Sequence, residues 1–343
     1  MSSISLRSEL QGVIVEFLKQ EKMSCLITQE GILSLINALS LYKEEGKLLF
    51  PEIFIIDDLE KLKYELKPFI YHFIDESDKT PETMFTALKK CAPLTEGGAW
   101  SIYILRKETK VEYGIFSYGE HLLSVDAKKI LLENDDYAKI IHIQQLTEKT
   151  VMLSGSKSEP LTVNFGINPT GDLSFIKNQI DLIYSILTNL KAVNKDPSVN
   201  FLNRVLTSVL QKSHGILIAV IDSKKKVVPK FLSDGITKIE KISIEKYVED
   251  LLNTKTLSAN YSIEGCASII SGMLLSDGIT IFDNSGSIRA YNVFVKIPKK
   301  ENIKTSGGAR ERTFEFLCSK INKGIISAFM QSQDGKTKFE GKL

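Results

Sequence analysis

Residues 215–221, GILIAVI, decide the expected fold of the second half of this chain. The six residues after Gly215 are all apolar, without the alternation that marks a strand with one solvent-facing side. A short apolar run of this kind is typical of a strand buried on both faces, in a sheet that helices cover. The run therefore predicts an α/β domain in which residues 215–221 form the central strand.

The segments around this run alternate between helical and strand-like patterns. Helices are expected at 201–211 and 243–252, and the apolar segment 267–275 follows them. Further along, we expect a hairpin from 279–282 and 288–295 around Asn284-Ser285-Gly286, a helix at 313–320 and a closing strand at 325–330. Together these elements predict one α/β domain over residues 200–343.

The first half of the chain has a different texture. Helical spacing covers 4–42, 59–74 and 81–91, a short apolar strand is expected at 53–56, and residues 99–165 alternate like paired strands. The polar stretch AVNKDPSVN at 192–200 contains a proline and predicts a linker. Residues 1–195 are therefore predicted to form an α+β N-terminal domain that serves in dimerisation or in binding a partner.

Composition excludes several classes of protein. The chain has 343 residues, 43% of them apolar and 25% charged, which is ordinary for a globular protein of two or three domains. A net charge of +2 without a long basic run argues against a broad nucleic-acid surface. No apolar run approaches the roughly 20 residues that span a bilayer, and the N-terminal stretch lacks the layout of a signal peptide. We therefore expect a cytoplasmic protein that does not act at a membrane.

The four cysteines are far apart in the sequence and form no C-x-x-C pair. Zinc sites and disulfide frameworks use closely spaced cysteines, so neither is expected here. We interpret all four as small buried apolar residues in a reducing compartment; they are Cys25, Cys91, Cys266 and Cys318.

Residues 307–317, GGARERTFEFL, place two arginines at the start of a helical pattern. The N-terminus of a helix presents unpaired N–H groups and a partial positive charge, and guanidinium groups suit phosphate. Gly307 and Gly308 would let a ligand approach the backbone closely. Arg310 and Arg312 are therefore candidate phosphate-binding residues, although an Arg-x-Arg pair at a helix start is also typical of a surface ion pair.

Two further polar residues occur at the start of expected strands. Asp277, in Ser276-Asp277-Gly278-Ile279, would offer a carboxylate to a divalent cation or to a hydroxyl proton, or it is simply a turn residue. His214 opens the central strand, and it is either a ligand contact or a strand-end histidine.

The order of these pieces resembles the diadenylate cyclase domain superfamily over roughly residues 200–340. That family has an Asp-Gly-Ala motif, which appears here as Asp277-Gly278-Ile279. Its Gly-Thr-Arg-His-Arg motif appears as Gly308-Ala309-Arg310-Glu311-Arg312, and its serine-acidic motif is blurred into Ser332-Gln333-Asp334-Gly335. The resemblance does not extend to residues 1–195.

The resemblance implies a fold and a chemistry. It implies a mixed central sheet wrapped by helices, ATP bound with Mg²⁺ or Mn²⁺, and a cyclic dinucleotide made between two ATP-loaded copies that face each other. By the same resemblance, Asp277 would assist the metal and the attacking 3′-hydroxyl, and Arg310 and Arg312 would hold phosphates. Gly278, Gly308, Glu311 and His214 would line the same nucleotide site.

Two positions depart from the family pattern. Ala309 replaces threonine and loses a hydroxyl, and Glu311 replaces histidine and adds a negative charge that opposes phosphate if it faces the site. Such changes are similar to those of the divergent DACNV-type branch, a group of predicted nucleotide sensors associated with bacterial conflict and antiviral systems. We therefore expect a nucleotide-binding sensor, acting as a homo-oligomer or with an effector protein. An active cyclase and a ligand-free scaffold remain the alternatives.

Overall fold

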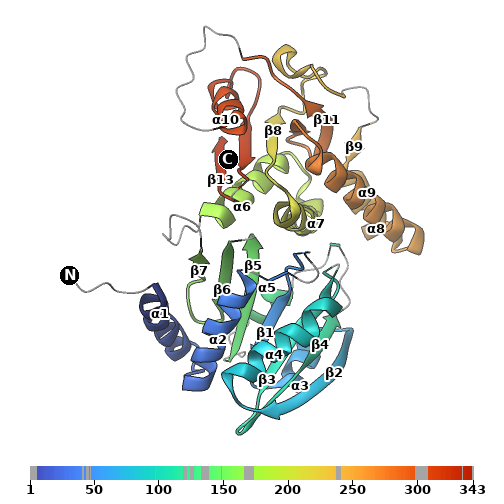
Figure 1. Cartoon of the computed structure of the whole chain (residues 1–343). Helices are drawn as coiled ribbons and strands as arrows, with labels where there is room; N and C mark the ends of the chain where they lie inside the picture. The colour runs from blue at the N-terminus through green and yellow to red at the C-terminus, as the bar shows by residue number, and fades with distance from the viewer. Residues whose placement is uncertain are drawn as a thin grey trace, which may run out of the picture. The chain divides into compact units, whose positions relative to one another are not determined.

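The computed structural model describes the chain in two compact units (Figure 1). It describes residues 6–40, 42–43, 46, 48–96, 98–118, 122–123, 127–132, 139–147, 149–165, 174–236, 241–297, 308–333 and 335–341. The N-terminal unit comprises residues 1–121 and 125–171, and the C-terminal unit comprises residues 122–124 and 172–343. Each unit is built on a mixed sheet with helices, which confirms the predicted α/β fold class.

The sheet of the N-terminal unit has seven strands in the order β2-β4-β3-β1-β5-β6-β7. Its strands are β1 (Glu52–Ile56), β2 (Phe69–Asp78), β3 (Ser101–Arg106), β4 (Lys110–Tyr118), β5 (Ile140–Thr147), β6 (Thr150–Gly155) and β7 (Leu161–Asn164). Only β1 and β3 pair in parallel; the other neighbours are antiparallel. The strand-rich texture predicted over 99–165 is therefore confirmed.

Helices cover both faces of this sheet. One apolar core joins the sheet to α1 (Leu6–Gln20), α2 (Leu26–Leu39) and α4 (Pro81–Cys91), and a second joins it to α3 (Leu59–Glu65) and α5 (Ala127–Leu132). Thr80 caps α4 as its sequence predicts, since its hydroxyl accepts a hydrogen bond from the Thr83 N–H.

A buried carboxylate ties α1 to the turn between β6 and β7. Glu21 is fully buried, and its carboxylate oxygens accept hydrogen bonds from the N–H groups of Ser156, Lys157 and Ser158 at 2.9, 3.0 and 2.7 Å. A Cβ at Gly155 would lie only 2.1 Å from the Glu21 carboxyl carbon, so glycine gives the carboxylate its room. A buried charge is stable only when it is paired in this way.

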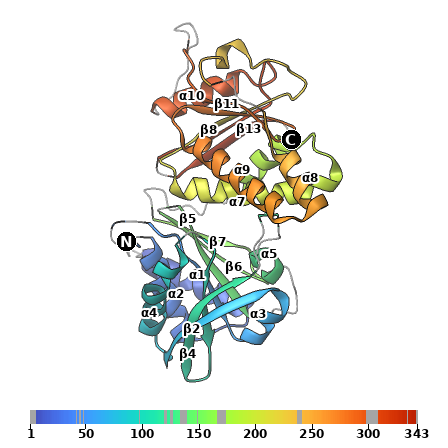
Figure 2. The same cartoon turned by 90° about the vertical axis from the view of Figure 1, so that its right-hand side faces the viewer.

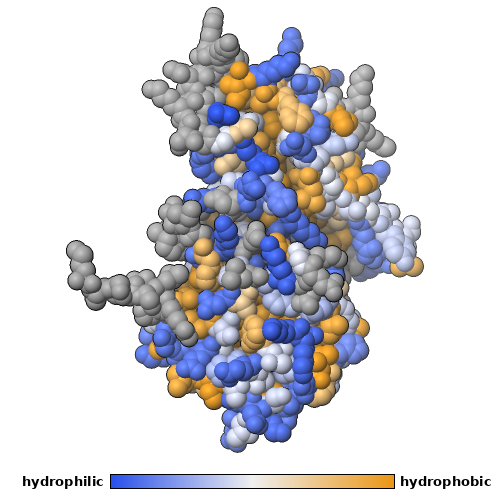
Figure 3. Space-filling model, viewed as in Figure 1, coloured by the Kyte–Doolittle hydropathy of each residue, from blue (hydrophilic) through white to orange (hydrophobic). Residues whose placement is uncertain are grey.

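The helix predicted at 59–74 is wrong beyond Glu65. The chain passes Pro68 and continues as β2, which is an edge strand of the sheet. Apolar side chains that the sequence pattern assigns to a buried helix face are instead exposed: Ile70 and Phe73 are both 56% exposed. In Figure 3 hydrophobic surface is visible along this side of the N-terminal unit.

The sheet of the C-terminal unit has six strands in the order β13-β12-β8-β10-β11-β9. Its strands are β8 (Leu217–Ile221), β9 (Ile242–Ser243), β10 (Ile279–Asp283), β11 (Ser287–Val293), β12 (Ser327–Gln331) and β13 (Thr337–Gly341). The run GILIAVI supplies β8, whose five residues are all buried and which lies inside the sheet. Strand β8 is parallel to β10 and antiparallel to β12, so the predicted central strand and mixed sheet are confirmed.

Alternate residues of β8 face two different cores, which explains why the whole run is apolar. Ile218 and Val220 pack with the helices α6 (Ser174–Ile186), α7 (Ala192–Lys212), α8 (Ile244–Thr254) and α9 (Leu257–Leu275). Leu217, Ala219 and Ile221 pack on the other face with α10 (Ala309–Ser319). Figure 2 shows the sheet between α10 and the group α7–α9.

Three predictions for this region need correction. The predicted linker 192–200 is the first part of α7, which contains Pro197, and the compact units divide instead between 171 and 172. Helix α6, which falls within the predicted N-terminal domain, packs in the core of the C-terminal unit. Strand β12 is not the last strand of the sheet, because β13 follows it in the sequence and pairs with it at the outside of the sheet.

Two of the four cysteines differ from the expectation. Cys91 and Cys266 are buried, and burial raises the pKa of each thiol to about 12. Cys25 and Cys318 are only half-buried.

None of the described helices has the length and apolarity needed to cross a membrane.

Candidate functional site

Parallel pairing brings the two expected strand-start motifs to one edge of the sheet. Ile279 of β10 lies opposite Leu217 of β8, so the amino ends of both strands are level. His214 comes three residues before β8 and Asp277 two residues before β10. Neighbouring strands are about 4.8 Å apart, so the segments that carry these two residues are close together.

The start of α10 reaches the same edge. Gly308 is the N-cap of α10, so both arginines lie in its first residues, earlier than the helix start that the sequence pattern predicts. Arg310 donates a hydrogen bond from Nη1 to the carbonyl oxygen of His214 at 2.9 Å. A Cβ at Gly215 would lie 2.6 Å from the same Nη1, so the guanidinium rests on the Gly215 backbone.

Two glycines are required where the chain turns into β8 and β10. Gly215 has φ +111° and Gly278 has φ +89°, values that residues with a side chain rarely adopt. A Cβ at Gly278 would also lie 2.8 Å from the carbonyl oxygen of Val293. The fold therefore accounts for glycine at both positions without any ligand.

Gly308 differs from these two glycines. Its φ of −69° suits any residue, and a Cβ there would meet no described atom within 4 Å. The fold therefore does not require glycine at the start of α10. Gly307, the other glycine of the motif, lies outside the described residues.

Asp277 is exposed, and its carboxylate makes one local hydrogen bond. Its Oδ1 accepts from the Gly278 N–H at 3.1 Å, and its backbone carbonyl accepts from the amide of Asn292. The described part of the chain has no group of three or more histidine, cysteine or acidic side chains placed to hold a metal ion. A single exposed carboxylate fits Mg²⁺ or Mn²⁺ only where ligand phosphates supply further oxygen atoms.

Glu311 is paired with a lysine of the neighbouring strand. Its Oε1 accepts a hydrogen bond from Lys338 Nζ of β13 at 2.6 Å, and this bond raises the pKa of Lys338. The charged segment 299–306, which precedes the motif in the sequence, lies outside the described residues. Arg312 is exposed, and its guanidinium makes no hydrogen bond or ion pair within the described ranges. Lys338 therefore offsets part of the negative charge beside the two arginines, since it also lies 3.9 Å from the carboxylate of Glu315.

One residue at this edge has no counterpart in the sequence analysis. Gln331, at the end of β12, is buried; its side chain donates to the Leu210 carbonyl oxygen and accepts from the Ser213 hydroxyl. Its backbone also exchanges two hydrogen bonds with Ile216. Gln331 thus anchors the segment that carries His214. The only signal in the sequence is its place beside Ser332-Gln333-Asp334-Gly335, of which Asp334 lies outside the described residues.

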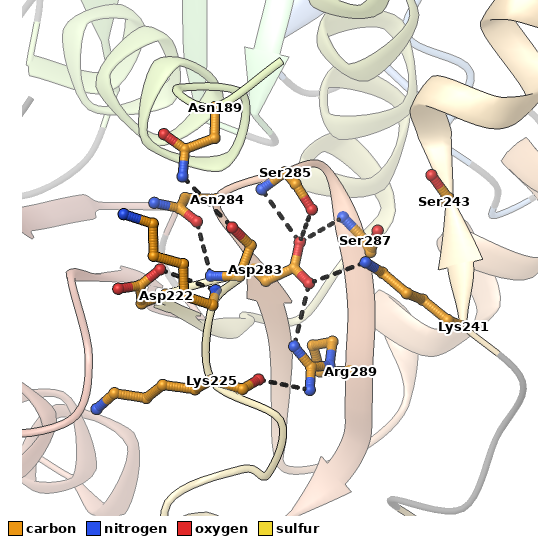
Figure 4. Close-up of polar contacts among 12 residues, drawn as sticks. Asn189, Asp222, Lys225, Lys241, Ser243, Asp283, Asn284, Ser285, Ser287 and Arg289 are labelled. Carbon is orange, nitrogen blue, oxygen red and sulfur yellow. Dashed lines mark hydrogen bonds and ion pairs between the residues drawn. The ribbon is translucent and has the colours of Figure 1, made fainter. Parts of the chain in front are cut away.

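A second polar network lies at the opposite edge of the sheet (Figure 4). Asp283, at the end of β10, is fully buried; its Oδ1 accepts from the Ser285 N–H, the Ser285 hydroxyl and the Ser287 N–H. Its Oδ2 contacts Arg289 at 3.2 Å and Lys241 at 3.6 Å. The sequence pattern of this segment indicates a hairpin turn but gives no sign of the network.

Comparison with known proteins finds no matching family model, no matching curated protein and no matching solved structure. The resemblance to the diadenylate cyclase superfamily therefore depends on the motif residues and their order alone.

The two kinds of glycine at this edge give a stability prediction. Gly215→Ala should lower the free energy of unfolding of the C-terminal unit by about 2 kcal/mol or more, because it adds strain at positive φ and a clash with Arg310. Gly308→Ala should change it by less than about 0.5 kcal/mol, since that position is open. Urea unfolding followed by circular dichroism measures both variants, and fluorescence of Trp100 follows the N-terminal unit as an internal reference. Equal stability of the two variants would contradict the geometry described here.

Proposed function

We propose that the C-terminal unit is a nucleotide sensor that binds the phosphate groups of an adenine nucleotide or cyclic dinucleotide. The proposed site comprises His214, the Asp277-Gly278 turn and residues 308–312. The observation that carries the proposal is the meeting of these three segments, far apart in the sequence, at one sheet edge where Arg310 binds the His214 carbonyl.

The chemistry of this edge suits an anion. The first N–H groups of a helix have no partner within the helix, and the helix dipole adds a partial positive charge. Arg312 supplies an exposed guanidinium, and Arg310 keeps further N–H donors besides the one bonded to His214. Gly308 leaves the backbone uncovered at the point where a phosphate would approach it.

Asp277 supplies the negative charge of the proposed site. With Mg²⁺ or Mn²⁺ present, its exposed carboxylate would hold the cation jointly with the nucleotide phosphates. Without a cation it would repel them, so nucleotide binding should be stronger with the divalent ion. The exposed imidazole of His214 lies at the same edge and is available to a base or a ribose.

The change from threonine to Ala309 favours binding without turnover, because the family's hydroxyl is lost. The Glu311–Lys338 pair favours the second candidate function, an active cyclase, because it reduces the repulsion between Glu311 and a triphosphate. In that reaction the 3′-hydroxyl of each ATP attacks the α-phosphorus of the other, and two pyrophosphates leave. Two copies of the chain would have to face each other across their nucleotides.

Arg312 gives a direct test of the proposed phosphate site. Arg312→Ala should weaken ATP binding at least about tenfold, because a charge-assisted contact to phosphate is lost. The fold should stay intact, because the exposed Arg312 side chain has no partner among the described residues. Isothermal titration calorimetry with ATP, and separately with cyclic diadenylate, measures the change. Lys323→Ala is the matched control, since Lys323 is also an exposed cation but lies beyond the other end of α10. Unchanged affinity in Arg312→Ala would place the phosphates elsewhere.

The choice between sensor and cyclase has its own test. After incubation with ATP and Mn²⁺ or Mg²⁺, the sensor proposal expects bound nucleotide and no cyclic dinucleotide by mass spectrometry, because Ala309 removes the family's hydroxyl from the motif. Synthesis that is lost in Asp277→Asn and kept in Asp250→Asn would overturn the sensor reading and establish the cyclase. Asp250 is the control because it is an exposed aspartate on α8.

A further inference from the structure

The opposite edge of the C-terminal sheet contains a cavity of about 450 Å³. It lies where the chain leaves β8, beside β9 and the start of β11. Four of its lining residues are cationic, Lys225, Lys226, Lys241 and Arg289, and Val228 and Ile288 contribute apolar wall. This size is within the usual range for small-molecule sites.

The guanidinium of Arg289 is held in place at this cavity by hydrogen bonds on both of its terminal nitrogens (Figure 4). Arg289 Nη2 donates to the carbonyl oxygens of Lys225 and Lys226 at 3.0 Å each, and its Nη1 donates to Asp283. Asp283 is fixed in turn by the Ser285–Ser287 turn. The buried carboxylate of Asp283 therefore orients Arg289, and Arg289 in turn holds the backbone of the turn at Lys225 and Lys226.

The charges at this cavity do not balance. Asp283 is the carboxylate that Arg289 and Lys241 contact, and it offsets one of their two positive charges. Neither Lys225 nor Lys226 pairs with a carboxylate among the residues described; Lys225 Nζ approaches the Gly324 carbonyl oxygen at 3.5 Å. Asp222, at the start of the turn, accepts from the Lys224 N–H. A surplus of positive charge beside a concave surface attracts anions.

We propose that this cavity is a second ligand site, which takes a small molecule that carries phosphoryl groups. It lies at the carboxyl ends of the parallel strands β8 and β10, the edge at which α/β sheets commonly bind ligands. Five residues of strand separate it from the Arg310 edge, a span of about 16 Å. One phosphoryl group therefore cannot contact both edges, and the two sites are chemically independent.

Calorimetric titration of the full chain with inorganic pyrophosphate tests this site. Every variant carries Arg312→Ala, so that binding at the other edge contributes little. Adding Lys226→Glu should weaken pyrophosphate binding at least about tenfold, because a charge that lines the cavity is reversed. Lys224→Glu is the matched control, since it makes the same charge change two residues away but does not line the cavity. We expect it to weaken binding by less than about threefold.

Unchanged unfolding midpoints show that the variants fold, which is expected because Lys224 and Lys226 are both exposed. Equal weakening by Lys224→Glu and Lys226→Glu would reduce the effect to general surface charge and overturn the proposal. Absence of pyrophosphate binding in the Arg312→Ala protein would also overturn it, whatever the outcome for ATP at the other edge.

Discussion

The parallel pairing of β8 with β10 is the constraint on which the rest of the C-terminal unit depends. Parallel strands put their amino ends at one edge of a sheet and their carboxyl ends at the other. The segments of His214 and Asp277 therefore come together at one edge, while the turn at residues 222–226 after β8 and the buried Asp283 at the end of β10 come together at the other. Both strands must be buried on both faces for this pairing to be stable, which the apolar run of β8 and the cores on its two sides provide.

Arg310 links this constraint to the candidate site. Its hydrogen bond to the His214 carbonyl links the start of α10 to the segment before β8, and the absence of a Cβ at Gly215 makes room for the guanidinium. Arg310 therefore has a structural role besides any role toward phosphate. Arg312 has no structural contact of this kind among the described residues, and Glu311 pairs with Lys338. The three residues of the Arg-Glu-Arg motif therefore have three different roles.

Much of this architecture could be predicted from the sequence, because it depends on interactions between residues that are close in the chain. The apolar run of β8, the Thr80 cap and the hairpin around residues 284–286 depend on residues close in the chain. The failures occur where distant contacts decide. Residues 192–200 are polar and contain Pro197, yet they are helical as part of α7, which packs in the core. Phe69–Asp78 has an apolar pattern compatible with a helix, but it forms the outermost strand of the sheet, with nine residue pairs to β4.

The same distinction applies to the site. The sequence pattern identifies His214, Asp277, Arg310 and Arg312, and the topology brings their segments to one edge. It gives no direction for Glu311, because the partner of Glu311 is a lysine 27 residues away on a strand that the pattern does not predict. The sequence does not predict the network of Asp283 for a related reason, because the network forms only when Lys241, just before β9, and Arg289, on β11, approach this carboxylate.

Hydrogen exchange of the full chain with and without ATP and Mg²⁺ tests the central claim most directly, because it reports every backbone segment at once. The proposed site predicts added protection in three separate segments, residues 213–216, 276–279 and 308–313, independently of protection at the cavity on the opposite edge. Protection in only one of these segments, or protection confined to the N-terminal unit, would contradict the claim that they form one nucleotide site.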